Sequence, residues 1–324
     1  MSTSSELARV AALRARFGSP AVGAGVRVGI GDDAAVLELL GGADPSLLVW
    51  TVDAQVDGTH FRTDWASWED IGWRSFMAAA SDLAAMGAEP VAALSSLVLA
   101  PAVDDEALDA LARGQAAAAA AIGAPVIGGN LARGTETSIT TTLLGRAAEP
   151  VLRSGARAGD GLWLAGPVGL AGIGLALLAK KMQNTRMQGA CDCLEAWRRP
   201  VARIAEGRTL AGVAHAAIDV SDGLAHDAWQ LAEASGVRLV LALDAVLAAG
   251  GEALIAGAAT LGDDPAEHAL HGGEDYALLV GSPRALPGFL RIGAVEAHDG
   301  GARVRMTTTR GTIDVEPRGF DHFT

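Results

Sequence analysis

The sequence predicts an α/β fold built from two domains. Short apolar runs typical of strands alternate with longer stretches of helical periodicity, and 324 residues are enough for two domains of ordinary size. After residue 150 the pattern restarts, because a polar, glycine-rich stretch, RSGARAGD at 153–160, precedes a new apolar run. We therefore predict one domain over residues 1–150 and a second over residues 151–324.

The first half opens with residues 1–18, which resemble an amphipathic helix in which Thr3 and Glu6 form a capping box. This stretch lacks the apolar core of a signal peptide, so we expect a cytoplasmic protein. A second helix should begin near Ser67 and end before Gly87 and Pro90. The other elements predicted here are strands over 47–53, 91–100, 124–130 and 137–145 and a helix over 104–123.

In the second half, the pattern predicts helices over 170–181 and 224–235 and from about residue 201, with strands over 216–220 and 237–243. Residues 180–199 are interpreted as a polar insertion, and GGEDYALLVG at 272–281 and a short tail end the chain. The longest apolar run, 165–179, contains glycines and is too short to cross a bilayer. We therefore expect no contact with a membrane.

The charge balance argues against several functions. A net charge of −13 disfavours binding to the phosphate backbone of a nucleic acid. Lys180 and Lys181 are the only lysines, and no Walker phosphate-binding motif is present. Metal ions and arginines would therefore have to supply positive charge at any phosphate site. Cys191 and Cys193 have no second cysteine cluster, so we interpret them as reduced thiols and not as zinc ligands.

Acidic and amide side chains lie where predicted strands and helices meet. Each alone could be a turn residue, a helix cap or part of a surface ion pair. Several acids at the ends of apolar strands are costly unless cations neutralise them, and oxygen ligands without His or Cys favour Mg²⁺ or Mn²⁺. Glycines in GIGDD, GGN and GGED would let backbone N–H groups approach an anion. The residues concerned are Asp32, Asp33, Asp53, Asp82, Asn130, Asp219 and Asp222.

The chain contains eight motifs in a fixed order: GIGDDAAVL, TVDAQVDGTHF, SDLAAMGAEP, GGNLARG, LRSGARAGD, DVSDGL, GGEDY and GFDHF. In these motifs and their order, the sequence resembles the thiamine-monophosphate kinase family over nearly its whole length, residues 180–199 excepted. That family belongs to the ATP-binding superfamily that includes aminoimidazole ribonucleotide synthetase. The resemblance implies a two-domain α/β subunit of that architecture, whose N-terminal sheets form a barrel in a homodimer.

The resemblance also implies an activity, the transfer of the γ-phosphoryl group of ATP to thiamine monophosphate, and a set of site residues. Implied magnesium ligands are Asp33, Thr51, Val52, Asp53, Asp82, Asn130, Asp219 and Asp222. Implied ATP contacts are Gly129, Asn130, Arg153 and Ser221, and implied thiamine contacts are His60, Glu274 and Phe320.

This chain departs from the family pattern at two positions. It has Asn130 where the family usually has Asp after two glycines, so that ligand would carry no negative charge. It has Val52 where the family often has a hydroxyl residue, so only the backbone there could bind a metal. We therefore expect weaker binding of Mg²⁺ at one site.

The implied reaction needs little proton transfer. The attacking phosphate oxygen is largely ionised near neutral pH, so no residue has to act as a strong general base and His60 need not do so. The obstacle is repulsion between two anionic substrates, which several carboxylate-bound Mg²⁺ ions would screen while aligning an in-line attack. On this view Asp33 serves the metal, and Asp32 serves the turn.

Other functions remain open on the sequence alone. One is a nucleotide-binding or thiamine-phosphate-binding relative without catalysis, with Asn130 marking a weakened site. Another is a sister enzyme of the same superfamily. The sister activities fit less well. A selenophosphate synthetase would need a reactive cysteine near the N-terminus, and no cysteine precedes Cys191; a hydrogenase maturation factor would need a terminal cysteine, and this chain ends in GFDHFT. Aminoimidazole-type substrates fit DGTHF and GGEDY poorly.

Overall fold

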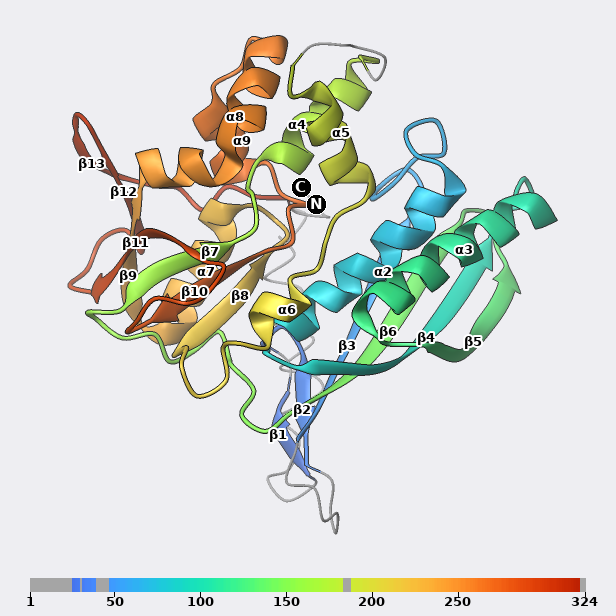
Figure 1. Cartoon of the computed structure of the whole chain (residues 1–324), viewed down its shortest axis with the longest axis horizontal. Helices are drawn as coiled ribbons and strands as arrows, with labels where there is room; N and C mark the ends of the chain where they lie inside the picture. The colour runs from blue at the N-terminus through green and yellow to red at the C-terminus, as the bar shows by residue number, and fades with distance from the viewer. Residues whose placement is uncertain (1–24, 30, 39–46, 183–187, 321–324) are drawn as a thin grey trace, which may run out of the picture.

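The structure, a computed structural model, describes residues 25–29, 31–38, 47–182 and 188–320. The helix predicted around Thr3 and Glu6 lies outside these residues. The described chain forms two β-sheets with helices packed against them (Figure 1). The fold is thus mixed α/β, as predicted, but the strand pairs are mostly antiparallel; only β4–β5 and β9–β12 are parallel.

The first sheet has the strand order β1-β2-β3-β6-β4-β5. Its strands are β1 (Val26–Val28), β2 (Ala35–Leu37), β3 (Leu47–Val56), β4 (Glu89–Leu99), β5 (Val126–Arg133) and β6 (Ser138–Ala147). Two long helices, α2 (Trp68–Ala85) and α3 (Asp105–Ile122), lie together over this sheet (Figure 1). These elements confirm the strands predicted over 47–53, 91–100, 124–130 and 137–145 and the helices predicted from Ser67 and over 104–123, with ends shifted by a few residues.

Local chemistry explains where these helices begin and how closely they pack. The side chains of Ser67 and Asp104 cap α2 and α3 by accepting N–H groups from the first turns. A Cβ atom on Gly72 would lie 2.1 Å from the carbonyl oxygen of Leu111, and one on Gly114 would lie 1.9 Å from that of Glu69. The two helix backbones therefore touch at reciprocal glycines, which no larger residue could replace without moving a helix.

The second sheet has the order β13-β12-β9-β11-β7-β10-β8. Its strands are β7 (Gly161–Ala165), β8 (Ala216–Val220), β9 (Val237–Ala242), β10 (Ala277–Ser282), β11 (Leu290–Ala297), β12 (Val304–Thr308) and β13 (Gly311–Asp314). The helices of this half are α4 (Leu170–Ala179), α5 (Ala190–Arg198), α6 (Ile204–Gly207), α7 (Leu224–Ser235), α8 (Leu243–Leu261) and α9 (Pro265–His271). Figure 1 shows α4, α5, α8 and α9 grouped beyond one end of this sheet.

The structure corrects several predictions in this half. The predicted polar insertion contains α5, and the helix expected from residue 201 is only the four-residue α6. Helices α8 and α9 and strands β11 to β13 were not predicted. Helix α8 is apolar on most sides and Gly251 interrupts it with non-helical dihedral angles, so its sequence shows no clear helical period.

Helix α8 also bears on the question of a membrane. Among the described residues it alone is long and apolar enough, by length and composition, to span a bilayer, and it exceeds the 165–179 run singled out from the sequence. Core helices of soluble proteins pass the same test. Here α8 carries Asp244 and Glu252 and packs against α4, α5 and α9 and strands of the second sheet.

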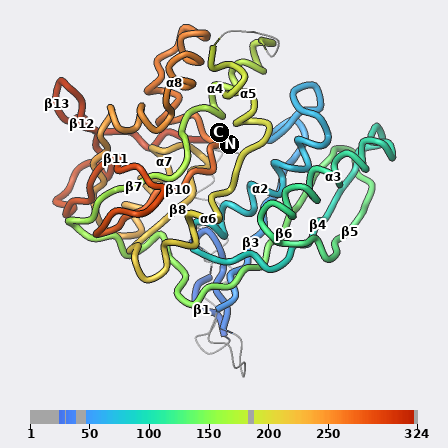
Figure 2. Tube along the Cα trace, in the orientation of Figure 1, coloured from blue at the N-terminus to red at the C-terminus, as the bar shows by residue number. Residues whose placement is uncertain are grey.

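The connection between the sheets runs through residues 148–160, where the chain leaves β6 and crosses to β7 (Figure 2). Strands of the first sheet thus come before residue 148 and strands of the second after residue 160. The division into folding units at 1–150 and 151–324 stays a prediction. Helix α2 contacts both halves, because it packs on β3 and β6 and also on β8 and β10.

Candidate functional site

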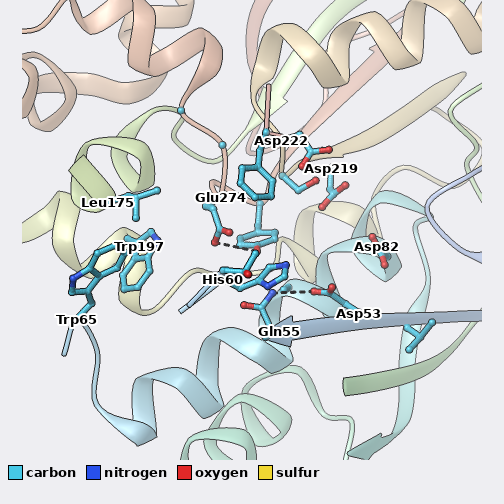
Figure 3. Close-up of a pocket in the computed structure, with 18 residues that line it drawn as sticks. Asp53, Gln55, His60, Trp65, Asp82, Leu175, Trp197, Asp219, Asp222 and Glu274 are labelled. Carbon is cyan, nitrogen blue, oxygen red and sulfur yellow. Dashed lines mark hydrogen bonds between the residues drawn. The ribbon is translucent and has the colours of Figure 1, made fainter. Parts of the chain in front are cut away.

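A cleft lies where the two halves meet, between β3, α2, the turn after β8 and the loop before β10 (Figure 3). Ten of the predicted site residues are among those that line it or lie directly beside it. The lining includes Val52, Asp53, His60, Asp82, Asp219, Ser221, Asp222, Glu274 and Phe320, and Asp33 meets Asp82 and Asp219 at its base. Residues more than 250 positions apart in the sequence therefore share one site.

Three carboxylates, from Asp33, Asp82 and Asp219, form the acidic centre. Each offers an oxygen within 4.8 Å of the others, although they come from the turn before β2, from α2 and from β8. Burial is the main cause that raises the pKa of all three, and repulsion from neighbouring aspartates adds to it for Asp82 and Asp219. A site that resists ionisation in this way favours a cation bound among its oxygens.

The protein balances only part of this negative charge. The Arg153 guanidinium pairs with Asp33, donating from Nε to Oδ1 over 2.9 Å, and the Arg153 backbone N–H donates to Asp32. Ser81 donates to Asp219 over 2.7 Å, and Thr51 donates to Asp82. Asp33 Oδ2 is buried and has no hydrogen-bond partner among the described residues. Among the described residues, one guanidinium faces three carboxylates, and one carboxylate oxygen has no hydrogen-bond partner. This excess of negatively charged oxygen ligands suits a divalent cation.

Asp32 and Arg153 show how the GIGDD motif is used. Asp32 accepts N–H bonds from Asp33 and Arg153, so it holds the turn to the second half, as expected for a turn residue. Burial, followed by repulsion from Asp33, raises the pKa of Asp32 to about 6. Burial lowers the pKa of Arg153, but the charges of the neighbouring aspartates and the hydrogen bond to Asp33 outweigh it, so the pKa is raised and the guanidinium stays ionised.

The turn after β8 is fixed by a residue that the sequence analysis did not single out. Asp227 is buried, and its Oδ2 accepts the backbone N–H groups of Ser221, Asp222 and Gly223 over 3.1, 3.1 and 3.2 Å. Together with Asp222 and His226 it forms a second group whose ligand atoms lie within 4.8 Å of one another. The signal for Asp227 was its place in the first turn of α7, where a carboxylate can bind free N–H groups.

The other end of the cleft is aromatic. Trp65, Trp197, Leu175 and His60 lie together there (Figure 3), and Tyr276 and Phe320 also line the cleft. The rings of Trp65 and Trp197 meet edge to face with their centroids 6.0 Å apart. His60 Nδ1 accepts the N–H of Val56 over 3.0 Å, so in the neutral ring Nε2 carries the proton. Flat apolar walls beside an acidic centre suit an organic cation that carries a phosphate.

Glu274 stands between these two ends on a backbone that few residues adopt. Its φ is 62° and that of Tyr276 is 49°, values that ordinary side chains seldom take. The N–H groups of these residues donate to Ser221 and Val220, which ties the loop to the end of β8. Such a conformation persists only where the surroundings hold it, and it is typical of functional loops.

Two predicted site residues lie elsewhere. Gly129 and Asn130 are exposed on the edge strand β5 and do not line the cleft. In the sheet register Asp53 pairs with Thr141, Thr141 with Ser95, and Ser95 with Gly129. Two strands thus separate β3 from β5, so these positions are about 14 Å apart, and Asn130 cannot share a metal ion with Asp53 of the same chain.

Thr51 and Val52 differ in orientation because side chains alternate along β3. Thr51 is buried and faces Asp82, whereas Val52 is 61% exposed and lies on the opposite face of the sheet. A metal ligand at Val52 would have to be its backbone carbonyl.

Comparison with known proteins gives this geometry a context. Residues 31–147 match the model of the N-terminal domain of AIR synthase related proteins. The thiamine-monophosphate kinase of Mycobacterium tuberculosis is 38% identical over 86% of this chain and 81% of its own, and that of Aquifex aeolicus is 32% identical over 91% and 92%. The solved structure of AaThiL complexed with AMPPCP and TMP matches with a TM-score of 0.87 at 30% identity, covering 98% of this chain and 97% of that one. The thiamine-monophosphate kinase from Stenotrophomonas maltophilia matches with a TM-score of 0.73 at 31% identity, over 93% and 96%.

Proposed function

The chain belongs to the thiamine-monophosphate kinase family, and from this premise we propose that it transfers the γ-phosphoryl group of ATP to thiamine monophosphate, giving thiamine diphosphate. The observation that carries the proposal is the meeting of Asp33, Asp82 and Asp219 from both halves, beside a cleft with aromatic walls. A solved relative, AaThiL, holds AMPPCP and TMP, which supports the same pair of substrates here.

We assign the acidic centre to Mg²⁺. Bound there, Mg²⁺ would supply positive charge to two substrates that repel each other. Asp33, Asp82 and Asp219 would hold it, with Thr51 fixing the carboxylate of Asp82. Asp53 and Asp222 also line the cleft and are proposed to bind further ions. Asp227 acts on the site by holding the turn that carries Asp222.

The chain's own residues then orient the reactants. Arg153 and Ser221 are proposed to contact the nucleotide, because both border the acidic centre. The phosphate of the acceptor is ionised near neutral pH, so the reaction needs no proton to be removed from it. Catalysis on this proposal comes from holding two phosphates in line and from exclusion of water by the aromatic end of the cleft.

The thiamine part of the substrate is proposed to lie at the aromatic end, near His60, Glu274 and Phe320. Phe320 is 51% exposed and can cover a flat ring from the solvent side. A thiazolium ring carries a positive charge, which aromatic faces and nearby carboxylates stabilise.

We also propose a homodimer formed through the first sheet, which would close the implied barrel. The face of this sheet that turns away from α2 and α3 exposes large apolar side chains, including Trp50, Leu94 and Ile127, of which Ile127 is 69% exposed. Exposed apolar patches of this kind mark interfaces. A second copy could also bring its own Gly129 and Asn130 to the site, which would explain why these residues lie far from the cleft of their own chain. Sedimentation analysis of Trp50→Glu, expected to be monomeric, tests this.

The decisive experiment incubates the purified protein with ATP and thiamine monophosphate over a Mg²⁺ series and measures thiamine diphosphate. Formation of the product that depends on Mg²⁺ supports the proposal. Binding of both substrates without product at saturating Mg²⁺ would instead identify a binding protein, the alternative that Asn130 raises. We infer a cytoplasmic location, in keeping with a soluble ATP-dependent enzyme.

A further inference from the structure

Arg74 lies in the middle of α2 and reaches from the first half into the second. Its side chain is 1% exposed, which is unusual for a residue that is always charged. A buried guanidinium needs partners on its donors, and the residues that provide them therefore show what the position is for.

All the partners of Arg74 belong to the wall of the cleft. Its Nη2 donates to Oε2 of Glu274, and its Nη1 donates to the carbonyl oxygen of Trp197 at the last turn of α5. The guanidinium also lies over the ring of Trp197, with its central carbon 4.2 Å from the ring centroid. One side chain thus fixes both the carboxylate and one of the tryptophans that line the cleft.

Because of these contacts, Glu274 does not act as a free negative charge in the cleft. Its charge is already balanced by Arg74, and Tyr276 donates to the same oxygen, Oε2, over 3.4 Å (Figure 3). The pair is therefore close to neutral, and Glu274 presents a held hydrogen-bond acceptor rather than a free negative charge. Such an acceptor recognises an N–H donor, such as the amino group of an aminopyrimidine, better than it attracts a cationic ring.

We propose that Arg74 is a positioning residue for substrate recognition: it locks Glu274 and Trp197 so that they read the amino-bearing ring of the substrate, and leaves the cationic ring to the rest of the cleft. The proposal rests on the proposed function. It also gives a role to α5, whose residues lie within the stretch 180–199 that matched no family motif.

The test compares Arg74→Met, Glu274→Gln and the double variant, using thiamine monophosphate as the variable substrate. Arg74→Met should raise KM for thiamine monophosphate roughly ten- to a hundredfold, the effect of a misplaced hydrogen bond to a charged group, and leave KM for ATP within about twofold. Because Arg74 acts through Glu274, the double variant should be no worse than the poorer single variant. Arg74→Lys keeps the charge but lacks the planar fork, so its KM should stay raised.

A second readout does not depend on catalysis. Arg74→Met leaves a buried carboxylate without its partner and should lower Tm by about 5 °C or more, and adding Glu274→Gln should recover at least half of that loss. Arg203→Met is the control for loss of a partly buried arginine away from the cleft: it should leave KM for thiamine monophosphate unchanged.

The last comparison uses a modified substrate. An analogue whose pyrimidine amino group is replaced by a carbonyl oxygen should be a much poorer substrate for the wild type, and Glu274→Gln should narrow that difference. An Arg74→Met enzyme that folds and has wild-type KM, or KM effects of Arg74→Met and Glu274→Gln that multiply in the double variant, would overturn the inference. A wild type without turnover would instead overturn the proposed function, and the Tm comparison would still decide whether Arg74 holds Glu274.

Discussion

Replacing Asp219 by Asn should make the metal-free protein more stable and at the same time remove its response to Mg²⁺. Asp219 lies with Asp33 and Asp82 within 4.8 Å, and the amide oxygen of Asn can still accept the hydrogen bond from Ser81. At this distance and an effective dielectric constant of about 20, one pair of like charges costs about 3 kcal/mol. Because the amide removes one of these charges and keeps the hydrogen bond, we expect a net gain of about 1–3 kcal/mol at pH 8.

The pH dependence fixes the sign of this effect. The pKa of Asp219 is raised on folding, so the folded state holds its proton more tightly than the unfolded state does. The cost of the cluster is therefore absent at low pH and appears as pH rises. The stabilisation by Asp219→Asn should accordingly be small at pH 5 and larger at pH 8.

Thermal unfolding at both pH values, with and without Mg²⁺ and with ionic strength held constant by NaCl, measures these terms. The expected gain of about 2 kcal/mol corresponds to roughly 3 °C in Tm for a chain of this size. The wild type should gain about 2.7 kcal/mol at a Mg²⁺ concentration of 100 Kd, and the variant much less. Asp160→Asn is the control: Asp160 is equally buried but pairs with His215, so the change should destabilise the protein and spare the Mg²⁺ response. An Asp219→Asn protein that is less stable at pH 8 and still responds to Mg²⁺ like the wild type refutes the metal assignment.

Three further changes probe other parts of the site. Asp53→Ala should abolish formation of thiamine diphosphate while circular dichroism stays unchanged, whereas the exposed control Glu252→Ala should keep full activity; an active Asp53→Ala enzyme counts against its role as a ligand. In the proposed homodimer, where a second copy brings its residue 130 to the site, Asn130→Asp should lower the Mg²⁺ concentration needed for half-maximal rate, and an unchanged titration contradicts a metal-binding role of residue 130. Burial raises the pKa of Asp275 to about 7, so ionising this carboxyl costs the folded state stability as pH rises towards 8. The free energy of unfolding of Asp275→Asn should therefore gain about 1–3 kcal/mol relative to that of the wild type between pH 5 and pH 8. A difference in stability between the two proteins that does not vary with pH contradicts this titration of Asp275.

The parts of the fold that the sequence predicted are those with strong local signals. Helices α2, α3 and α7 have capping or stop residues at one or both ends, and β3 and β4 are long runs of apolar and β-branched residues. Helix α8 and strands β11 to β13 were not predicted because their local signals are weak. Helix α8 lacks a polar face with a clear period, β11 and β13 are largely exposed, and β12 has only five residues. Local chemistry decided what could be predicted.

The site residues also differ in whether a local sequence signal reveals them. Acids at strand ends were identifiable because their burial is costly, and the structure brings Asp33, Asp82 and Asp219 together. Arg74 was not identifiable, because an arginine inside a helix is most often a solvated residue and its role depends on a contact with Glu274, 200 positions away. Asp227 did have a local signal, its place in the first turn of α7, and its hydrogen bonds reach only to the turn just before that helix. Packing between distant segments therefore hides the role of Arg74 but not that of Asp227.

Helix α2 explains why binding and the cohesion of the two halves should be linked. Arg74, Ala78 and Ser81 follow one another at helical spacing on the face that meets the second half, and Asp82 adjoins them. Arg74 pairs with Glu274 and Ser81 bonds Asp219, so attraction and like-charge repulsion act across the same junction. Without a cation, the repulsion opposes the ion pair and the hydrogen bond. A divalent ion between Asp82 and Asp219 would turn that repulsion into a further link, so occupancy of the site should tighten the contact between the halves as well as prepare it for the phosphates.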